Sequence, residues 1–284
     1  MNNFKSEKAL RIFGICSACA ALLSVALRLI SIFLFYDTAI GYYKSGAILP
    51  IISQLFPIVS VIAAIIFTAI PKISVKPLIP ENTFATRSLA IFPAAGFSAY
   101  AVLYLFHTVE YLGALEVIVL KAFFWNILLA VAFVCAAVFF WLVFLGKRLD
   151  SMLFVAMGLG VVISLVAFLA SSYFDVLVQM NSPNKTVFHF AVLSIMLLTV
   201  NEMRIDIIQK RPSFHLFSAV AAAIYATTSA VPSIICSIAG KMPLNYALIF
   251  EDGVLLAYAV FAFARLFQLC FSKKEVPLCE ETQQ

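Results

Sequence analysis

Charged residues are scarce in this sequence. Only 12% of the 284 residues are Asp, Glu, Lys or Arg, whereas 64% are hydrophobic; in soluble globular domains about a quarter are charged. A water-soluble chain of this length could not bury so much apolar surface, so lipid must solvate part of it. The shortage of charge therefore predicts an integral membrane protein whose first partner is the lipid bilayer.

Long polar segments are also missing. No polar stretch exceeds about 20 residues, which is too short to form a hydrophobic core of its own. We therefore expect no attached kinase, nuclease or nucleotide-binding module. The net charge of +5 does not indicate nucleic-acid binding, because the basic residues are spread over short loops in the manner of topology signals.

Cysteines are missing from the predicted outer loops. All six lie in apolar stretches or on the side assigned to the cytoplasm, so no disulfide framework is expected. Cys16 and Cys19 have the spacing of a redox or metal pair. They lie in an apolar helix without a second pair of ligands, which favours small-residue packing instead.

Catalytic motifs are missing as well. The sequence has no Gly-x-Ser-x-Gly elbow, no His-Glu-x-x-His and no Gly-x-Gly-Asp, which are motifs of hydrolases and proteases. An intramembrane enzyme with an unfamiliar motif stays open as a third alternative, but no catalytic residue and no cofactor are predicted.

The apolar residues form runs long enough to cross a bilayer, which takes about 20 helical residues. The first run, from Ile12 to Tyr36, is longer than the core of a signal peptide and predicts an uncleaved span. The fold class is all-α, a polytopic transmembrane helix bundle in one domain over 1–284, with short tails at 1–11 and 271–284. Eight spans are predicted near 12–36, 47–70, 88–107, 122–145, 151–173, 186–207, 214–239 and 245–270.

The basic residues predict the orientation of the bundle. With the N-terminus inside, fourteen Lys and Arg residues fall on inner segments or near the inner ends of spans, four fall on outer loops, and Arg28 lies deeper within a span, which accounts for all 19. Inner loops of membrane proteins carry an excess of Lys and Arg. We therefore expect a cell membrane, in particular a bacterial inner membrane, with both termini in the cytoplasm.

Small residues four positions apart recur in several spans, Ala156 and Gly160 among them. Such pairs let helix backbones approach closely, which predicts a packed bundle. Pro57, Pro93 and Pro232 fall inside predicted spans. Each is expected to kink its helix unless neighbouring groups compensate.

A weak internal similarity suggests a parallel repeat of four plus four spans. At an offset of 138 residues, the Phe-Tyr-Asp of 35–37 falls on the Tyr-Phe-Asp of 173–175, and the loop at 70–72 falls on 208–210. Few identities lie between these matches, and apolar sequences align easily by chance. A repeat would suit a transporter with a site between its halves.

Arg28 lies deep within the first predicted span, in the outer third of the membrane. Ionisable side chains at such depth face partners or water. One interpretation is contact with an anion or carboxylate. The other is snorkelling towards the interface, or pairing with an outer acid such as Asp37.

A polar site is predicted at the outer face, formed by Arg28, Asp37, His107, Glu110 and His189. Carboxylates beside aromatic rings suit a small cationic or amine solute. The alternative is an interfacial tyrosine belt, with acids where Lys and Arg are excluded. The spacing gives no metal signature, so no metal is predicted. The other outer acids are Glu116, Asp175, Glu251 and Asp252.

An ion pair is predicted near the inner boundary, between Glu202 of the sixth span and Arg265 of the eighth, which reach similar depths. Asp206 shares the helix face of Glu202. The pair would satisfy two expensive charges. It is either a static structural pair or a gate or proton-coupling element.

Hydroxyl residues Thr227, Thr228 and Ser229 precede Pro232 in the seventh span. They either compensate backbone groups freed by the proline or line a polar pathway.

Together these features favour a small-solute or ion transporter. A sensory or accessory protein acting through a membrane partner subunit is the alternative, because fold class alone does not determine function.

Overall fold

The chain is a bundle of long helices. The computed structural model describes residues 2–37, 42–44, 46–70, 84–114, 120–146, 151–174, 182–208, 212–241 and 246–271. Eight helices in these residues are long and apolar enough to cross a membrane, which confirms the predicted eight-span, all-α bundle. The elements are α1 (Asn2–Phe35), β1 (Tyr36–Asp37), β2 (Tyr42–Tyr43), α2 (Ile48–Ala69), α3 (Phe84–Leu89), α4 (Ile91–Ala114), α5 (Leu120–Leu145), α6 (Ser151–Phe174), α7 (Pro183–Ile208), α8 (Pro212–Ile238) and α9 (Tyr246–Phe271).

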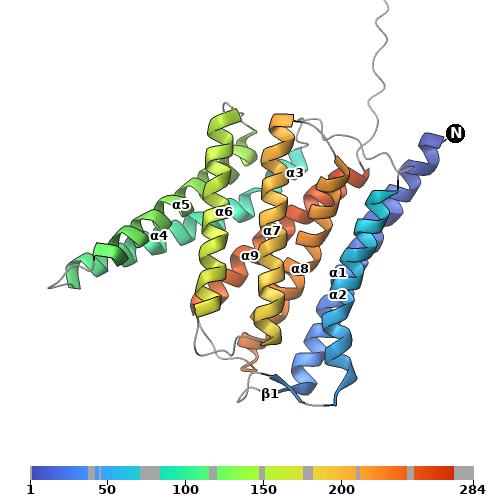
Figure 1. Cartoon of the computed structure of the whole chain (residues 1–284), viewed down its shortest axis with the longest axis horizontal. Helices are drawn as coiled ribbons and strands as arrows, with labels where there is room; N and C mark the ends of the chain where they lie inside the picture. Colours follow the sequence, from blue (N-terminus) through green and yellow to red (C-terminus); the bar gives the residue numbers. More distant parts are fainter. Residues whose placement is uncertain are drawn as a thin grey trace, which may run out of the picture.

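The start of α1 and the end of α9 lie at one end of the bundle, and the β1–β2 hairpin lies at the other (Figure 1). We call these the N-terminal end and the hairpin end. An even number of crossings requires this arrangement. That the N-terminal end faces the cytoplasm stays a prediction from the charge distribution.

Helix α8 lies at the centre of the bundle. It packs against α7, α9, α1 and α2, and α4, α5 and α6 extend the bundle on the far side of α7 and α9 (Figure 1). In α8, 72% of the most apolar stretch is buried, against 28% in both α1 and α2. The interior of the bundle is therefore built around α8, with α7 and α9 beside it.

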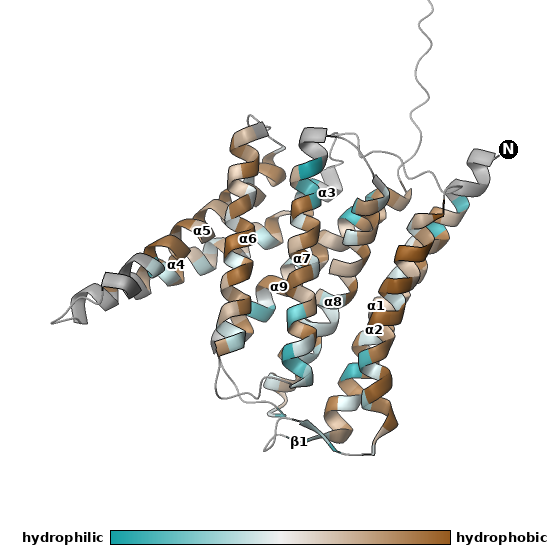
Figure 2. Cartoon of the chain, in the orientation of Figure 1, coloured by the Kyte–Doolittle hydropathy of each residue, from teal (hydrophilic) through white to brown (hydrophobic). Residues whose placement is uncertain are grey.

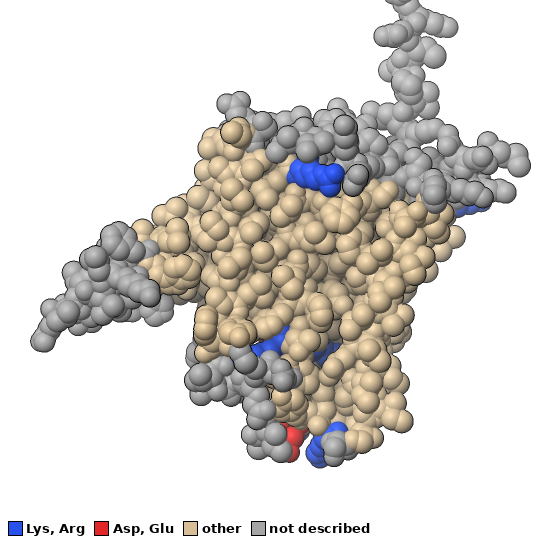
Figure 3. All heavy atoms as spheres, in the orientation of Figure 1, with Lys and Arg blue, Asp and Glu red and all other residues tan. Residues whose placement is uncertain are grey.

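Large apolar side chains cover the outside of the bundle. Leu22 is 70% exposed, Ile48 71% and Phe106 66%. Hydrophobic residues dominate most helices, while hydrophilic residues gather at both ends of α7 (Figure 2), and few charged atoms interrupt the side of the bundle (Figure 3). Lipid acyl chains can solvate such an apolar surface, whereas water cannot. The chain is a multi-pass membrane protein.

An aromatic core joins α4 and α5 to α9. Phe140 of α5 stacks on Phe97 of α4, with ring centroids 5.7 Å apart. It also packs edge-on against Tyr258 and Phe261 of α9, at 5.3 and 5.5 Å. Edge-on and offset contacts of this kind are favourable for aromatic rings. This core positions the face of α9 that also carries Arg265.

Glycines end two of the helices. Gly240 has a φ of 69°, where a residue with a Cβ would be strained. Its amide donates to the Ser237 carbonyl, and the Lys241 amide donates to the Cys236 carbonyl, which is the Schellman pattern at a helix C-terminus. Gly146, with a φ of 64°, directly follows the last residue of α5, and its amide donates to the Val143 carbonyl at 3.2 Å.

Two of the differences between the helix bounds and the predicted spans concern the start of α1 and the third span. Helix α1 begins at Asn2, within the predicted tail. The third span is broken at Ala90 between α3 and α4, so Pro93 lies in the first turn of α4, where a missing N–H matters little. Pro57 and Pro232 do lie inside α2 and α8.

The proposed repeat is not tested by the structure. Residues 71–72, 175 and 209–210, on which part of the similarity depends, lie outside the described residues. The four-plus-four arrangement stays a prediction.

Gly160 sets how closely α6 approaches α5. A Cβ built on Gly160 would collide with the Cβ of Cys135 and lie 3.0 Å from the carbonyl oxygen of Ala132. We expect Gly160→Ala to lower the free energy of unfolding by about 1–3 kcal/mol through overpacking. Thermal unfolding in detergent measures the loss.

Gly253 provides the matched control. It is exposed on α9, and a Cβ there meets nothing within 4 Å. Gly253→Ala should leave stability unchanged or raise it by up to about 1 kcal/mol. Equal melting temperatures for both variants would contradict the close approach of α5 and α6.

Candidate functional site

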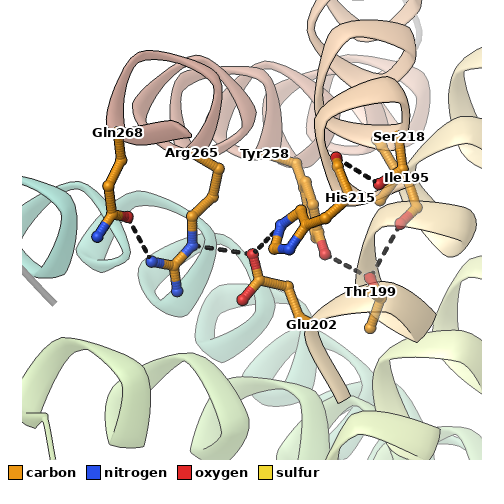
Figure 4. A network of polar contacts seen from close by, with 8 residues as sticks. All are labelled: Ile195, Thr199, Glu202, His215, Ser218, Tyr258, Arg265 and Gln268. Atoms are coloured by element: carbon orange, nitrogen blue, oxygen red, sulfur yellow. Dashed lines mark hydrogen bonds and ion pairs between the residues drawn. The ribbon is translucent and has the colours of Figure 1, made fainter. Parts of the chain in front are cut away.

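A buried charge cluster joins α7, α8 and α9 towards the N-terminal end of the bundle. Oε1 of Glu202 on α7 lies 2.8 Å from Nε of Arg265 on α9 and 3.0 Å from Nε2 of His215 on α8. The carboxylate lies between the two bases (Figure 4). None of the three side chains is more than 10% exposed. We call these residues the Glu202 cluster.

The predicted contact between Glu202 and Arg265 is thus present. Its role as a gate or as a static pair stays open at this point. The side chain of Asp206, which the sequence placed on the same face, lies outside the described residues.

Arg265 has further partners on its own helix. Its Nη1 donates a hydrogen bond to Oε1 of Gln268 at 2.9 Å. The guanidinium also lies over the ring of Phe261, 5.0 Å from the centroid, in a cation–π contact. Arg265 therefore has favourable contacts that do not involve Glu202.

A hydroxyl pair continues the polar contacts one turn further into the bundle. Thr199 of α7 shares a hydrogen bond with the hydroxyl of Tyr258 on α9. Thr199 donates to the Ile195 carbonyl at 3.0 Å, so Tyr258 is the donor to Thr199. Both side chains are fully buried. Polar contacts between α7 and α9 thus extend beyond the charged residues (Figure 4).

His215 is the member of the cluster that sequence reasoning missed. It lies near the start of α8, where it resembles an ordinary boundary residue. The connection between α7 and α8 is short, however, so a residue just inside α8 must lie opposite one just before the end of α7. That signal would have paired His215 with Glu202. Among the described residues, Nδ1 of His215 is buried without a hydrogen-bond partner.

A second cluster lies at the hairpin end. Arg28 of α1 is 4% exposed, and its Nη2 donates to Oδ1 of Asn184 on α7 at 2.8 Å. Tyr36 and Tyr43 of the hairpin pack edge-on, with centroids 5.6 Å apart, and both interact electrostatically with Arg28. Asp252 of α9 is 5% exposed and accepts a hydrogen bond from Ser233 of α8. We call Arg28, Tyr36, Tyr43, Asn184 and Asp252 the Arg28 cluster.

The two hairpin tyrosines keep their protons at neutral pH. Burial raises the pKa of Tyr36 and of Tyr43 above the ordinary value. Tyr36 hydrogen bonds to Ser182 and Asn184, which ties the hairpin to the start of α7. Their hydroxyls are therefore available as hydrogen-bond donors.

The other residues of the predicted outer site have no described contact with Arg28, or their side chains lie outside the described part of the chain. Asp37 is half-buried in β1 and pairs with Tyr42 in the hairpin register. Arg28 donates to Asn184 rather than to Asp37. His189 is half-buried on α7, one turn from Lys185. The side chains of His107 and Glu110 on α4, like Glu116 and Asp175, are not among the described residues.

The hydroxyls before Pro232 bond within α8. Thr228 donates to the Ile224 carbonyl at 2.7 Å, and Thr227 donates to the Ala223 carbonyl at 2.6 Å. Pro232 frees the carbonyl of Thr228, one turn before it. These two hydroxyls therefore do not compensate the freed group. Whether Thr227, Thr228 and Ser229 line a pathway stays a prediction.

No family model, curated protein or solved structure matches the chain. Within the part of the chain that the structure describes, no three His, Cys, Asp or Glu side chains gather as a metal site requires. The candidate site therefore rests on the geometry of the two clusters alone.

Removing Glu202 should destabilise the protein strongly. Glu202→Ala leaves the Arg265 charge buried without its carboxylate, and breaking a buried pair in this way costs about 3–5 kcal/mol. Arg265→Ala should cost a similar amount. The double variant should lose much less than the sum of the two, because neither charge is then left alone.

Thermal unfolding of the purified variants in detergent measures this cycle. Lys44→Ala, at an exposed position of the hairpin end, serves as the control and should unfold like the wild type. Additive losses in the double variant would show that Glu202 and Arg265 are not coupled.

Proposed function

We propose that this chain transports a small solute or ion across the membrane, and that the Glu202 cluster is a gate at one end of the route. The observation that supports this most is the convergence of three ionisable side chains from three spanning helices, none more than 10% exposed. Ionisable residues at such depth are rare, and they usually mark substrate pathways or proton relays.

A purely structural role would not need these charges. Replacing a buried ion pair by well-packed apolar residues is often neutral or stabilising, by about 1–4 kcal/mol. Apolar residues do fill neighbouring positions, since Phe261 lies one turn before Arg265 and is fully buried. If these charges served only the stability of the bundle, apolar residues in their place would make it more stable. A pair that can break and re-form offers a second state instead.

The contacts around the pair suit separation. If α7 and α9 move apart, Arg265 keeps Gln268 and the ring of Phe261. Glu202 keeps His215, 3.0 Å away. Neither charge is then left without a partner, so the open state is accessible at moderate free energy. Partners on both sides of a breakable contact are what a gate requires.

The same three helices connect the gate to the Arg28 cluster. Asn184 lies at the start of α7, Ser233 near the end of α8 and Asp252 near the start of α9. Tilting one of these helices would therefore change both clusters together. Alternating access in transporters is largely rigid-body movement of this kind around a central site.

Reconstitution into sealed vesicles tests the function. The purified chain is inserted into phosphatidylethanolamine and phosphatidylglycerol vesicles, and uptake of radiolabelled amino acids, amines, organic acids and alkali cations is measured. We expect uptake of at least one of these classes above that of empty vesicles. Glu202→Gln should reduce this uptake at least about tenfold, because the gate can no longer close once the carboxylate charge of Glu202 is lost.

Lys44→Gln, at the exposed hairpin position, is the matched control and should transport like the wild type. Size-exclusion chromatography of each variant shows whether it is folded. The absence of any uptake by the folded wild type would contradict the proposal and favour an accessory role. If the folded Glu202→Gln variant takes up solute at the wild-type rate, the Glu202 cluster is not a gate.

A further inference from the structure

The Arg28 cluster contains two opposite charges that are buried near each other without forming an ion pair. Arg28 is 4% exposed and Asp252 is 5% exposed. Their charges interact electrostatically, but no ion pair joins these two residues. Charges inside a membrane are normally paired with each other or with a ligand. Each of the two therefore has unused capacity to bind a charged group.

The basic side of the cluster has hydrogen-bond donors to spare. Nη2 of Arg28 is taken by Asn184. Nε of Arg28 and the hydroxyl of Tyr43 are both buried and have no hydrogen-bond partner among the described residues. A guanidinium edge beside a neutral hydroxyl matches a carboxylate, which accepts several hydrogen bonds in one plane.

The acidic side has an acceptor to spare. Oδ2 of Asp252 accepts a hydrogen bond from Ser233, the one hydrogen bond of this carboxylate among the described residues. Its other oxygen can receive a charged donor such as an ammonium group. Arg28 lies on α1 and Asp252 on α9, so a ligand between them would contact two helices that also pack against α8.

We propose that the Arg28 cluster binds a small zwitterion of the amino-acid type, with its carboxylate on Arg28 and Tyr43 and its ammonium group on Asp252. Such a ligand satisfies both buried charges and brings no net charge into the bilayer, which an anion or a cation alone would do. The inference rests on the proposed function, because it names the class of solute carried. Binding, however, can be measured without transport.

Titration of the full-length protein in detergent tests the site. Each standard amino acid is added to the purified wild-type chain, and binding is measured by calorimetry. For an amino acid that binds, two analogues are then compared, one without the amino group and one without the carboxylate. Each analogue should bind at least about tenfold more weakly, because one charged contact is lost. Absence of binding by every amino acid, or equal affinity for the analogues, would overturn the proposal.

Two conservative variants place the ligand on these residues. Arg28→Lys keeps the charge but loses the planar donor edge, and Asp252→Asn keeps an acceptor for Ser233 but loses the charge. Each should weaken amino-acid binding by about tenfold to a hundredfold. Asp252→Asn should leave binding of the analogue without an amino group unchanged. Unaltered amino-acid affinity in either folded variant would overturn the assignment.

Ser31→Ala is the matched control. Ser31 is fully buried on α1, one turn from Arg28, and its hydroxyl donates to the Leu27 carbonyl of its own helix at 2.7 Å. This variant should bind like the wild type. If Arg28→Lys does not fold, the comparison of the two analogues on the wild-type protein still tests the proposed binding site.

The outcome separates this inference from the proposed function. If the protein binds an amino acid in a manner that depends on Arg28 but takes up no solute into vesicles, the transport proposal is contradicted and the binding-site proposal stands. Uptake of another solute, with no amino acid bound, would keep transport and overturn the site.

Discussion

A charge inside a bilayer needs a partner, and this bundle supplies one for Glu202 from each of two neighbouring helices. Arg265 on α9 and His215 on α8 both contact one oxygen of the carboxylate. The relative rotation of α7, α8 and α9 is thereby constrained, because turning any one of them would break at least one of the two contacts with the carboxylate. The aromatic contacts of Phe140 with Tyr258 and Phe261 then hold α4 and α5 against the same face of α9.

The two clusters share α7 and α9 and lie towards opposite ends of these helices. In the Glu202 cluster the carboxylate contacts both basic side chains, although Nδ1 of His215 has no hydrogen-bond partner among the described residues. In the Arg28 cluster, Arg28 and Asp252 form no ion pair with each other, and Nε of Arg28 and the hydroxyl of Tyr43 have no acceptor among the described residues. A paired cluster suits a contact that opens and closes, and an incompletely paired one suits a ligand. Because the helices between them are continuous, a ligand that changes the spacing of α1 and α9 would shift the balance between the open and closed states of the proposed gate.

Features that depend on properties summed along the chain could be predicted from the sequence. Hydropathy gave the eight spans, and counting depth along the helices placed Glu202 level with Arg265. Features that depend on which helices are neighbours could not. Arg28 meets Asn184, far away in sequence, and no local pattern records that α1 packs against α9. The helix start at Asn2 was missed because a helix continues past the apolar run while its backbone bonds are satisfied.

If the Glu202 cluster is a gate, the buried polar contacts between α7 and α9 must open to water. Labelling of Thr199→Cys, one turn from Glu202, by a water-soluble maleimide in a background without native cysteines measures this opening. Val200→Cys, on the lipid-facing side of α7, is the reference. We expect Thr199→Cys to react, and to react faster when Glu202→Gln is added. If Thr199→Cys is as unreactive as Val200→Cys with and without that change, the helices do not separate and the Glu202 cluster is not a gate.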